Sequence, residues 1–412
     1  VYFMLVYVKN CKDEPLMPCS PAKAKKLLKS GEAKVVSHTP FTIKLLFGSS
    51  SYKQEIVAGM DTGSKFIGCA VKSNGKVLYQ SEVQIRFDVS KKMKQRKMYR
   101  RTRRCRKLRY RKMRWQNRAL MRKKGRLAPS IRSKIDSHLR EKKFVESILP
   151  VTRWIIETAK FDIHKITNPN VKGVNYQLGD QKDFYNVKAY IVDRDGYICQ
   201  HCKGKTKDKK LRVHHIISRL TGTNSPDNLI TLCVTCHKRL HLGEIKLSLK
   251  GKRSKTKHAT EIGIVKSQLK KQWIGFEETF GYETKYKREQ ILGLPKSHIN
   301  DAISICCEDK QIELNNDNVY LKKHVSSGDY QQTKGKHSEI KIPTGKLFGL
   351  RKFDLVDTTK GVGFIKGKRS SGYFVLSNIC GDLNISSVSI KKKCKRILAR
   401  KTTLTERKMQ HN

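Results

Sequence analysis

Acidic residues are scarce in this sequence. Its 412 residues include 35 Asp and Glu against 89 Lys and Arg, which gives a formal net charge of +54 at pH 7. Each Lys or Arg that neutralises a phosphate releases condensed counterions, so a polyanion is the expected partner. The sequence also lacks an apolar run of about 18 residues and a signal peptide. We therefore expect no membrane partner and favour a nucleic acid.

Cysteine does not follow the pattern of a disulfide scaffold. Four of the 12 cysteines fall in two Cys-x-x-Cys pairs, and a chain of this length can build a core without cross-links. Hydrophobic residues make up 37% of the sequence, which suffices for two or three compact domains of about 100–200 residues. We therefore expect a multidomain α+β protein in a reducing, cytosolic compartment.

The first 50 residues predict a compact α+β module. It combines a helical stretch at 21–29 with short β-rich runs at 5–8, 34–36 and 41–47.

Two segments after residue 245 are polar, 246–258 and 313–346. Residues 246–258 are rich in Lys and Ser and predict a flexible hinge. Residues 313–346 show no clear pattern of a helix or strand. From Leu347 onward, short β-rich runs alternate with Gly-rich turns, which predicts a small β-barrel.

Residues 91–126 contain 20 Lys and Arg and no Asp or Glu. The segment has no Pro, and no Gly before Gly125, so it is able to form one long helix. A basic run is often a solvated face or a disordered tail. Here the length, the interleaved aromatic residues and the position between two folded segments favour a helix ordered by nucleic acid. Ten arginines are candidate phosphate contacts: Arg96, Arg100, Arg101, Arg103, Arg104, Arg106, Arg109, Arg111, Arg114 and Arg118.

Two Cys-x-x-Cys pairs lie 30 residues apart, Cys199 with Cys202 and Cys233 with Cys236. Four thiolates with this spacing suit a closed tetrahedral zinc site, which holds a fold and leaves no position for catalysis. The sequence therefore predicts a structural Zn²⁺.

Four histidines lie around these cysteines. His214 and His215 follow an apolar run, so we expect them on a strand with their side chains on opposite faces. Residues 226–229 are expected to enter a helix that carries His237 and His241 on one face. His214, His237 and His241 can then bind a divalent metal while His215 faces a water. A hydrolase that acts on a phosphate ester needs this division between a metal and a neutral base.

Three carboxylates are candidates for a second centre. Asp61 ends the apolar run 56–60 and precedes a hairpin return at 66–71, and Glu157 ends the apolar run 154–156. Taken singly, an Asp before Thr-Gly usually stabilises a turn, and a Glu after a strand is usually a solvated strand end.

A helix after Pro295 supplies the third carboxylate. It presents His298 and Asp301 three residues apart, beside a core-facing stripe formed by Ile299, Ala302, Ile303 and Cys306. With Asp61 and Glu157, these residues would form a cluster able to hold two Mg²⁺ for in-line phosphodiester cleavage.

The ordered Cys and His motifs resemble the HNH nucleases, whose fold is ββα-metal. The resemblance implies that His215 is the general base, that Asn228 orients it, and that His214, His237 and His241 hold one Mg²⁺. Many members carry Asp-His where this chain has His214-His215.

The motifs around Asp61, Glu157, His298 and Asp301 resemble a split RuvC domain, which has an RNase H-like α/β core in three pieces. An Arg-rich helix separates the first two pieces and an HNH insertion the last two. With Pro-Leu-Met-Pro at 15–18, this order is similar to the IscB family of transposon-encoded, RNA-guided nucleases.

The resemblance implies a domain order. It runs as a PLMP domain at 1–50, RuvC-I at 51–90, an Arg-rich bridge helix at 91–128, RuvC-II at 129–180, an HNH domain at 181–245, a linker and RuvC-III at 246–312, and a C-terminal RNA- and target-motif-binding domain at 313–412.

Membership would imply a monomer within a ribonucleoprotein, in a prokaryotic cytoplasm. Its partners would be a large noncoding guide RNA and double-stranded DNA with a short flanking motif. The HNH site would cut the guide-paired strand and the RuvC site the displaced strand.

Two other functions remain open. One is a free-standing HNH endonuclease of the homing or restriction type, which would cut DNA without RNA. The other is a basic RNA-binding protein with silent nuclease sites, although each expected catalytic position carries a chemically competent residue.

Overall fold

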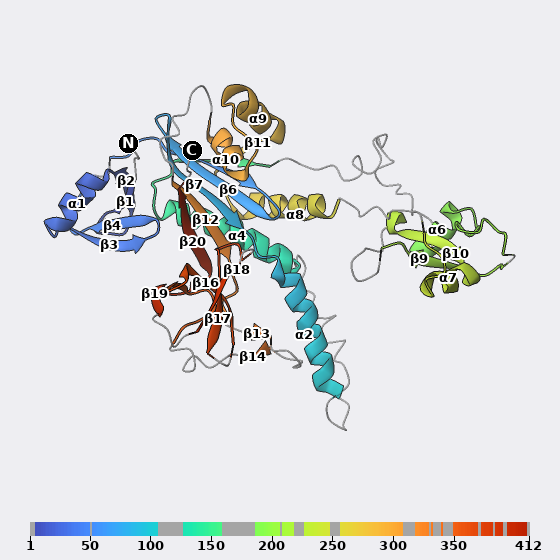
Figure 1. Ribbon diagram of the computed structural model, residues 1–412. Helices are drawn as coiled ribbons and strands as arrows, with labels where there is room; N and C mark the ends of the chain where they lie inside the picture. The colour runs from blue at the N-terminus through green and yellow to red at the C-terminus, as the bar shows by residue number, and fades with distance from the viewer. Residues whose placement is uncertain are drawn as a thin grey trace. The chain divides into compact units, whose positions relative to one another are not determined.

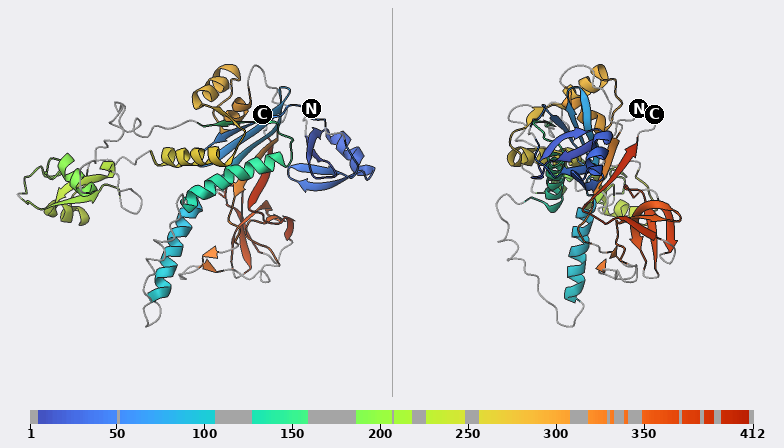
Figure 2. Two further views of the ribbon diagram at one scale, coloured as in Figure 1. Left: turned by 180° about the vertical axis from the view of Figure 1, so that it is seen from behind. Right: turned by 90° about the vertical axis from the view of Figure 1, so that its left-hand side faces the viewer.

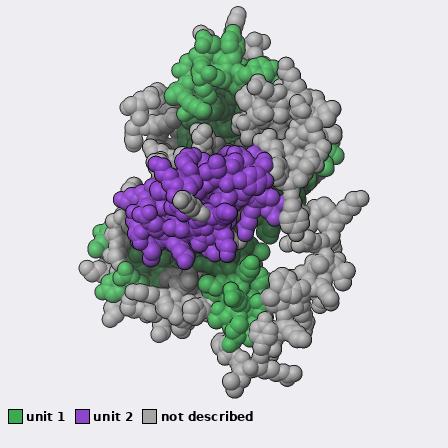
Figure 3. All heavy atoms as spheres, turned by 90° about the vertical axis from the view of Figure 1, so that its right-hand side faces the viewer, with its two compact units in different colours: residues 1–159, 264–412 green, residues 160–263 purple. Residues whose placement is uncertain are grey.

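We describe the chain from a computed structural model (Figures 1 and 2). The structure describes residues 5–49, 52–105, 127–158, 186–206, 208–217, 226–247, 256–307, 318–328, 331–332, 339–340, 349–369, 372–381, 384–389 and 394–409. The chain forms two compact units, one of residues 1–159 and 264–412 and one of residues 160–263 (Figure 3).

The N-terminal module has the predicted elements. A four-stranded sheet of order β2-β1-β4-β3 packs against one helix. The Ser20 hydroxyl caps this helix, and Pro21 occupies its first turn. The Pro-Leu-Met-Pro segment, for which the sequence predicted no strand, is an edge strand. The elements are β1 (Val6–Lys9), β2 (Pro15–Cys19), α1 (Pro21–Lys29), β3 (Ala33–His38) and β4 (Phe41–Leu45).

A seven-stranded mixed sheet of order β11-β8-β5-β6-β7-β12-β20 forms the centre of the first unit (Figure 1). The predicted hairpin is confirmed, because β5 and β6 pair antiparallel. The strands are β5 (Val57–Thr62), β6 (Phe66–Ser73), β7 (Lys76–Gln84), β8 (Arg153–Glu157), β11 (Glu277–Thr279), β12 (Asn318–His324) and β20 (Thr403–Met409).

Helices from three chain segments accompany the sheet. They are α2 (Asp88–Cys105), α4 (Pro129–Glu146), α8 (Thr256–Gln272), α9 (Gly281–Tyr286) with a π-helical turn (Lys287–Ile291), and α10 (His298–Cys306). The predicted helix after Pro295 is confirmed by α10, which packs on β5 and β6. The hinge predicted at 246–258 is wrong at its end, because α8 begins at Thr256; residues 248–255 lie outside the described chain.

The predicted Arg-rich helix begins at Asp88 as α2 and contacts α4 (Figure 2). Five of the ten arginines, Arg96, Arg100, Arg101, Arg103 and Arg104, lie on α2. The continuation through Arg106, Arg109, Arg111, Arg114 and Arg118 falls outside the described residues.

The C-terminal region contributes to three sheets, of which the smallest is the antiparallel pair of β13 and β14. Strands β12 and β20 join the central sheet, which the weak signal at 313–346 did not predict. A second sheet has the order β18-β17-β16-β15-β19, and its described strands leave two edges, so a closed barrel is not confirmed. The remaining strands are β13 (Gln331–Gln332), β14 (Glu339–Ile340), β15 (Leu355–Thr358), β16 (Gly361–Lys368), β17 (Tyr373–Ser377), β18 (Asn384–Ser389) and β19 (Cys394–Leu398).

The second unit is small. It contains a β9–β10 hairpin between two helices, with a 3-10 turn (Pro226–Asn228) before β10. Its elements are α6 (Val187–Arg194), β9 (Leu211–His215), β10 (Leu229–Cys233) and α7 (Val234–His241). Throughout the described chain, no helix combines the length and the apolar character needed to cross a membrane.

A fully buried ion pair joins α4 to the central sheet. Lys322 donates to both carboxylate oxygens of Glu141 at 2.8 and 2.9 Å, and both side chains are 1% exposed. The hydroxyls of Tyr79 and Ser81 also donate to Glu141. A charge removed from water this completely depends on such partners, because its desolvation is costly.

Replacing Lys322→Met is expected to lower the free energy of unfolding by about 3–5 kcal/mol, because Glu141 keeps a buried charge without its counter-ion. Replacing both residues, as Glu141→Leu with Lys322→Met, is expected to cost less than the single change. Urea unfolding followed by fluorescence suits the measurement, since Trp154 and Trp273 lie in the same core. The exposed pair Arg239–Glu244 is the control, and a double change worse than the single one would contradict the prediction.

Candidate functional site

The alternation of side chains along β5 and β8 places two carboxylates on one face of the central sheet. Ala58 and Met60 belong to the main core, while Val57 packs with Ile305 of α10. Asp61 therefore points to the α10 face. Strand β8 runs parallel to β5 with Met60 opposite Ile156, so Glu157 lies beside Asp61. The Thr62 hydroxyl donates to the Glu157 carbonyl at 2.8 Å and ties the two strand ends together.

Two glycines let α10 come close to this face. A Cβ at Gly59 would lie 2.6 Å from the Ala302 carbonyl oxygen, and one at Gly68 would lie 1.8 Å from that of His298. Any larger residue would push the helix away. The close approach brings His298 Nδ1 to 2.6 Å from Asp61 Oδ2.

Each carboxylate of the cluster contacts a basic side chain. His298 donates to Asp61, Lys266 Nζ lies 3.6 Å from Glu157 Oε1, and Arg288 donates to Asp301. The structure thus places the four expected residues on one side of the central sheet: Asp61, Glu157, His298 and Asp301. Their partners Lys266 and Arg288 were not predicted from the sequence.

A signal for Lys266 was present in the sequence. It occupies one position of the buried stripe Ile262, Val265, Lys266 and Leu269 on α8, where an apolar residue would be expected. We find no corresponding signal for Arg288, which lies in the π-helical turn.

Burial and neighbouring charges shift the pKa values of three groups in the cluster. Burial raises the pKa of Glu157, and the charge of Asp61 raises it further. Burial lowers the pKa of Lys266, although the charges of Glu157 and Asp61 act to raise it. The hydrogen bond to Asp61 raises the pKa of His298. Carboxylate oxygens are the ligands that Mg²⁺ prefers. The three carboxylates are not, however, as closely grouped as the two clusters of the second unit.

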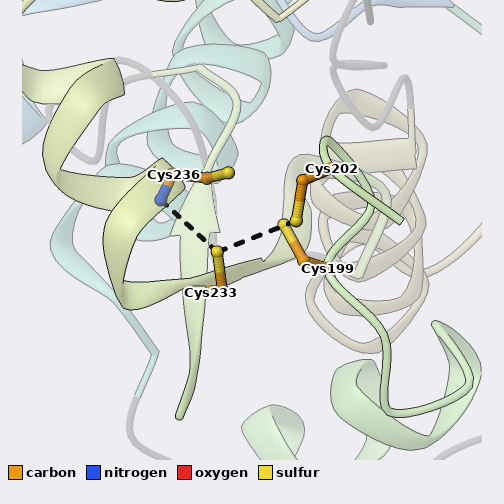
Figure 4. Close-up of side chains that lie close together, drawn as sticks. All are labelled: Cys199, Cys202, Cys233 and Cys236. Carbon is orange, nitrogen blue, oxygen red and sulfur yellow. Dashed lines mark hydrogen bonds between the residues drawn. The ribbon is translucent and has the colours of Figure 1, made fainter. Parts of the chain in front are cut away.

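The four predicted zinc cysteines come together in the second unit (Figure 4). Their sulfur atoms all lie within 4.8 Å of one another, and the Cys202 and Cys233 sulfurs are 3.9 Å apart. Tetrahedral zinc with bonds of about 2.3 Å places its ligands about 3.8 Å apart. Cys233 also caps α7, because its sulfur accepts from the Cys236 amide at 3.4 Å.

The thiols of this cluster do not behave alike. Burial raises the pKa of Cys202, but hydrogen bonds with Thr206 outweigh it and lower the pKa to about 6. Burial and the neighbouring thiols raise the pKa of Cys236. Four thiolates so close together would repel one another, and a divalent metal removes this repulsion. The site is compatible with a structural zinc ion.

Three of the predicted histidines form a second cluster. Ligand nitrogens of His214, His237 and His241 lie within 4.8 Å of one another. The ring centroid of His214 is 5.1 Å from each of the other two, which are 4.6 Å apart. Burial lowers the pKa of His214 and of His237, and the neighbouring imidazoles lower it further. Neutral imidazoles are the form that binds a metal.

Asn228 holds the chain that follows β9. Its side-chain oxygen accepts from the Ile217 amide at 2.8 Å, and its side-chain nitrogen donates to the Ile217 carbonyl at 3.0 Å. The role of orienting His215 stays a prediction.

The prediction that residues 226–229 enter the helix of His237 is wrong. The run Leu-Ile-Thr-Leu-Cys forms β10 instead, because it pairs with β9 and is fully buried. Helix α7 then starts at Val234.

Two family models match the chain. The model described as RRXRR protein matches residues 6–179, which include the sequence Arg-Arg-Thr-Arg-Arg at 100–104 on α2. The HNH endonuclease model matches residues 199–242, which hold both the cysteine and the histidine cluster. A comparison with curated proteins finds no match. The chain therefore contains an HNH endonuclease domain, which supports a metal-dependent nuclease activity.

Replacing Cys202→Ser is expected to remove zinc and to unfold the second unit, because four ligands hold a core that is otherwise small. Elemental analysis and amide hydrogen exchange of the purified protein measure the two effects. Cys11→Ser, at an exposed cysteine, is the control and keeps its metal. A Cys202→Ser protein with full zinc content and unchanged exchange would refute the structural role.

His298 is expected to titrate above the ordinary histidine pKa of about 6.5, because Asp61 favours its protonated form. The stabilisation that the pair gives is complete below about pH 6.5 and is lost as the pH rises through the folded-state pKa. NMR titration of the imidazole in EDTA measures this pKa. Asp61→Asn should lower it, and a pKa that does not respond to this change would contradict the assignment.

Proposed function

We propose that this chain is an RNA-guided DNA endonuclease of the IscB type. The observation that carries the proposal is the presence in one chain of an HNH endonuclease domain and a separate carboxylate cluster. The cluster is drawn from β5, β8 and α10, and the HNH domain lies in the sequence between β8 and α10. The RRXRR match over residues 6–179 supports the same family.

In the HNH domain, His215 is the proposed general base. It follows His214 on β9, so the two imidazoles leave opposite faces of the strand. A Mg²⁺ held by His214, His237 and His241 would supply charge stabilisation of the phosphate and the leaving oxygen. His215 would take the proton from the attacking water. The proposed target is the guide-paired strand.

In the RuvC centre, His298 is the proposed base for the displaced strand. Its bond to Asp61 fixes the ring, so one nitrogen is left to accept a proton. Asp61, Glu157 and Asp301 would hold two Mg²⁺, which supply charge stabilisation when bound. Lys266 and Arg288 hold Glu157 and Asp301 in place in the described structure, so we assign them a positioning role.

The proposed partners are a noncoding guide RNA and double-stranded DNA with a short flanking motif. The net charge of +54 supports extended phosphate contact. Arg96, Arg100 and Arg101 are exposed on α2, where guanidinium groups are able to bind phosphates. The domain boundaries expected from the sequence are part of this proposal.

Replacing His215→Ala is expected to reduce cleavage of the guide-paired strand at least about hundredfold, because it removes a general base. Cleavage of the displaced strand should remain. Asp61→Ala should give the opposite nickase. Strand-specific end labels on a target duplex measure both outcomes in Mg²⁺.

The matched controls are His38→Ala and Asp357→Ala, which lie in other sheets at exposed positions. Loss of both cuts in either single variant, with RNA binding retained, would contradict the assignment of two separate sites. Sequencing of RNA that copurifies with the full chain tests the guide. Target cleavage without RNA would favour a free-standing HNH endonuclease, and RNA without cleavage a silent RNA-binding protein.

A further inference from the structure

A hydroxyl group lies beside the cysteine cluster of the second unit. Thr206 Oγ1 is 3.2 Å from the sulfur of Cys202 and 3.2 Å from the sulfur of Cys233. These two sulfurs are 3.9 Å apart and belong to different Cys-x-x-Cys pairs (Figure 4). One side chain therefore contacts both halves of the candidate zinc site.

A tight turn after Cys202 brings Thr206 to this place. The Lys205 amide donates to the Cys202 carbonyl at 3.0 Å, which closes a four-residue turn. Its two central residues, Lys203 and Gly204, both have a positive φ, of 50° and 88°. Such a turn reverses the chain, and glycine adopts the left-handed conformation without steric cost. The backbone thus returns Thr206 to the cluster, where its side chain is half-buried.

A hydroxyl in this position acts as a donor when the cysteines bind a metal as thiolates. It carries one proton, and a hydrogen bond to a charged acceptor is about twice as strong as one between neutral groups. A proton shared between the sulfurs of Cys202 and Cys233 draws charge from both and reduces their repulsion. Groups that hydrogen-bond to metal ligands in this way fix the ligands in position and raise metal affinity.

A second side chain contacts the cluster more weakly. His201 Nδ1 lies 3.6 Å from the Cys236 sulfur, and the imidazole is exposed, so water competes for the same contact. Thr206, in contrast, contacts a sulfur whose residue is 1% exposed, that of Cys233. A hydrogen bond shielded from water contributes more than an exposed one. Thr206 is therefore the stronger of the two contacts.

We propose that Thr206 is a positioning residue for the structural zinc. Its hydroxyl binds the sulfurs of Cys202 and Cys233, joins the two halves of the site and increases the affinity for the metal. The proposal rests on the zinc interpretation of the four cysteines. It depends neither on a guide RNA nor on cleavage, so it goes beyond the proposed function.

Two substitutions separate the hydroxyl from the packing of the side chain. Thr206→Val keeps the shape and removes the hydroxyl, whereas Thr206→Ser keeps the hydroxyl and removes the methyl group. The zinc affinity of the full chain, measured by equilibrium competition with a chromophoric chelator, is expected to fall about 10–100-fold in Thr206→Val. Thr206→Ser should stay close to the unaltered protein. Thr102→Val is the matched control, because the Thr102 hydroxyl donates to the Met98 carbonyl on α2.

Cobalt in place of zinc gives a second readout that a loss of packing does not produce. In the Co²⁺-loaded protein, the sulfur-to-metal charge-transfer bands report the electron density on the thiolates. Thr206→Val should move these bands to longer wavelength, because the sulfurs lose a hydrogen bond that draws charge from them. Thr206→Ser and Thr102→Val should leave the bands in place.

Three results would overturn the proposal. They are an unaltered protein that elemental analysis finds without zinc, a Thr206→Val protein with unchanged affinity and spectrum, and equal losses in the Val and Ser variants, which would assign the effect to packing. Amide hydrogen exchange shows whether each variant is folded. The variants Thr206→Ser and Thr206→Ala differ by the hydroxyl alone, and they provide the same comparison where Thr206→Val does not fold.

This proposal and the proposed function fail separately. Guided cleavage by a protein whose zinc affinity does not respond to Thr206→Val would refute the role of Thr206 and leave the endonuclease in place. Weaker zinc binding in Thr206→Val, in a protein that cuts no target with RNA, would do the reverse.

Discussion

The contact between α10 and the strands β5 and β6 is the constraint on which the carboxylate cluster depends. A backbone approach this close is available only to glycine, and Gly59 and Gly68 provide it on neighbouring strands. The contact places His298 against Asp61, which lies directly opposite Gly68. The geometry of the centre is therefore determined by residues with no side chain. Rigid elements hold such a centre more accurately than loops would.

The candidate metal ligands of the two units are arranged in different ways. In the HNH domain, soft cysteine sulfurs and imidazole nitrogens form two tight groups whose ligand atoms lie within 4.8 Å, as dedicated metal sites do. In the central sheet, hard carboxylates are balanced by His298, Lys266 and Arg288. The first arrangement is set by short local spacings. The second is drawn from chain segments more than 200 residues apart in the sequence, as the contact between Asp61 and His298 demonstrates.

This difference explains which elements and site residues could be predicted from the sequence. Local patterns predicted the hairpin whose first strand carries Asp61, the helix of His298, and both clusters of the HNH domain. Arg288 was missed because tertiary packing brings it to Asp301, and Lys266 was missed although it stands at a buried, otherwise apolar position of α8. Strand β12 was missed for the same reason as Arg288, since a polar segment enters the sheet by pairing with β7. Residues 226–229 were assigned to a helix entry and β10 was missed, because its pairing with β9 is not visible in local propensity.

The place where the second unit enters the chain has a topological consequence. Strands β8 and β11 are parallel neighbours, so the chain must cross over between them, and α8 lies in that crossover. Residues 160–263 occupy the same connection. Because the entropy of closing a loop grows only with the logarithm of its length, a whole domain inserted there adds little to the cost of pairing the two strands. A crossover is therefore a position where the central sheet can accommodate an inserted domain without altering its own strand order.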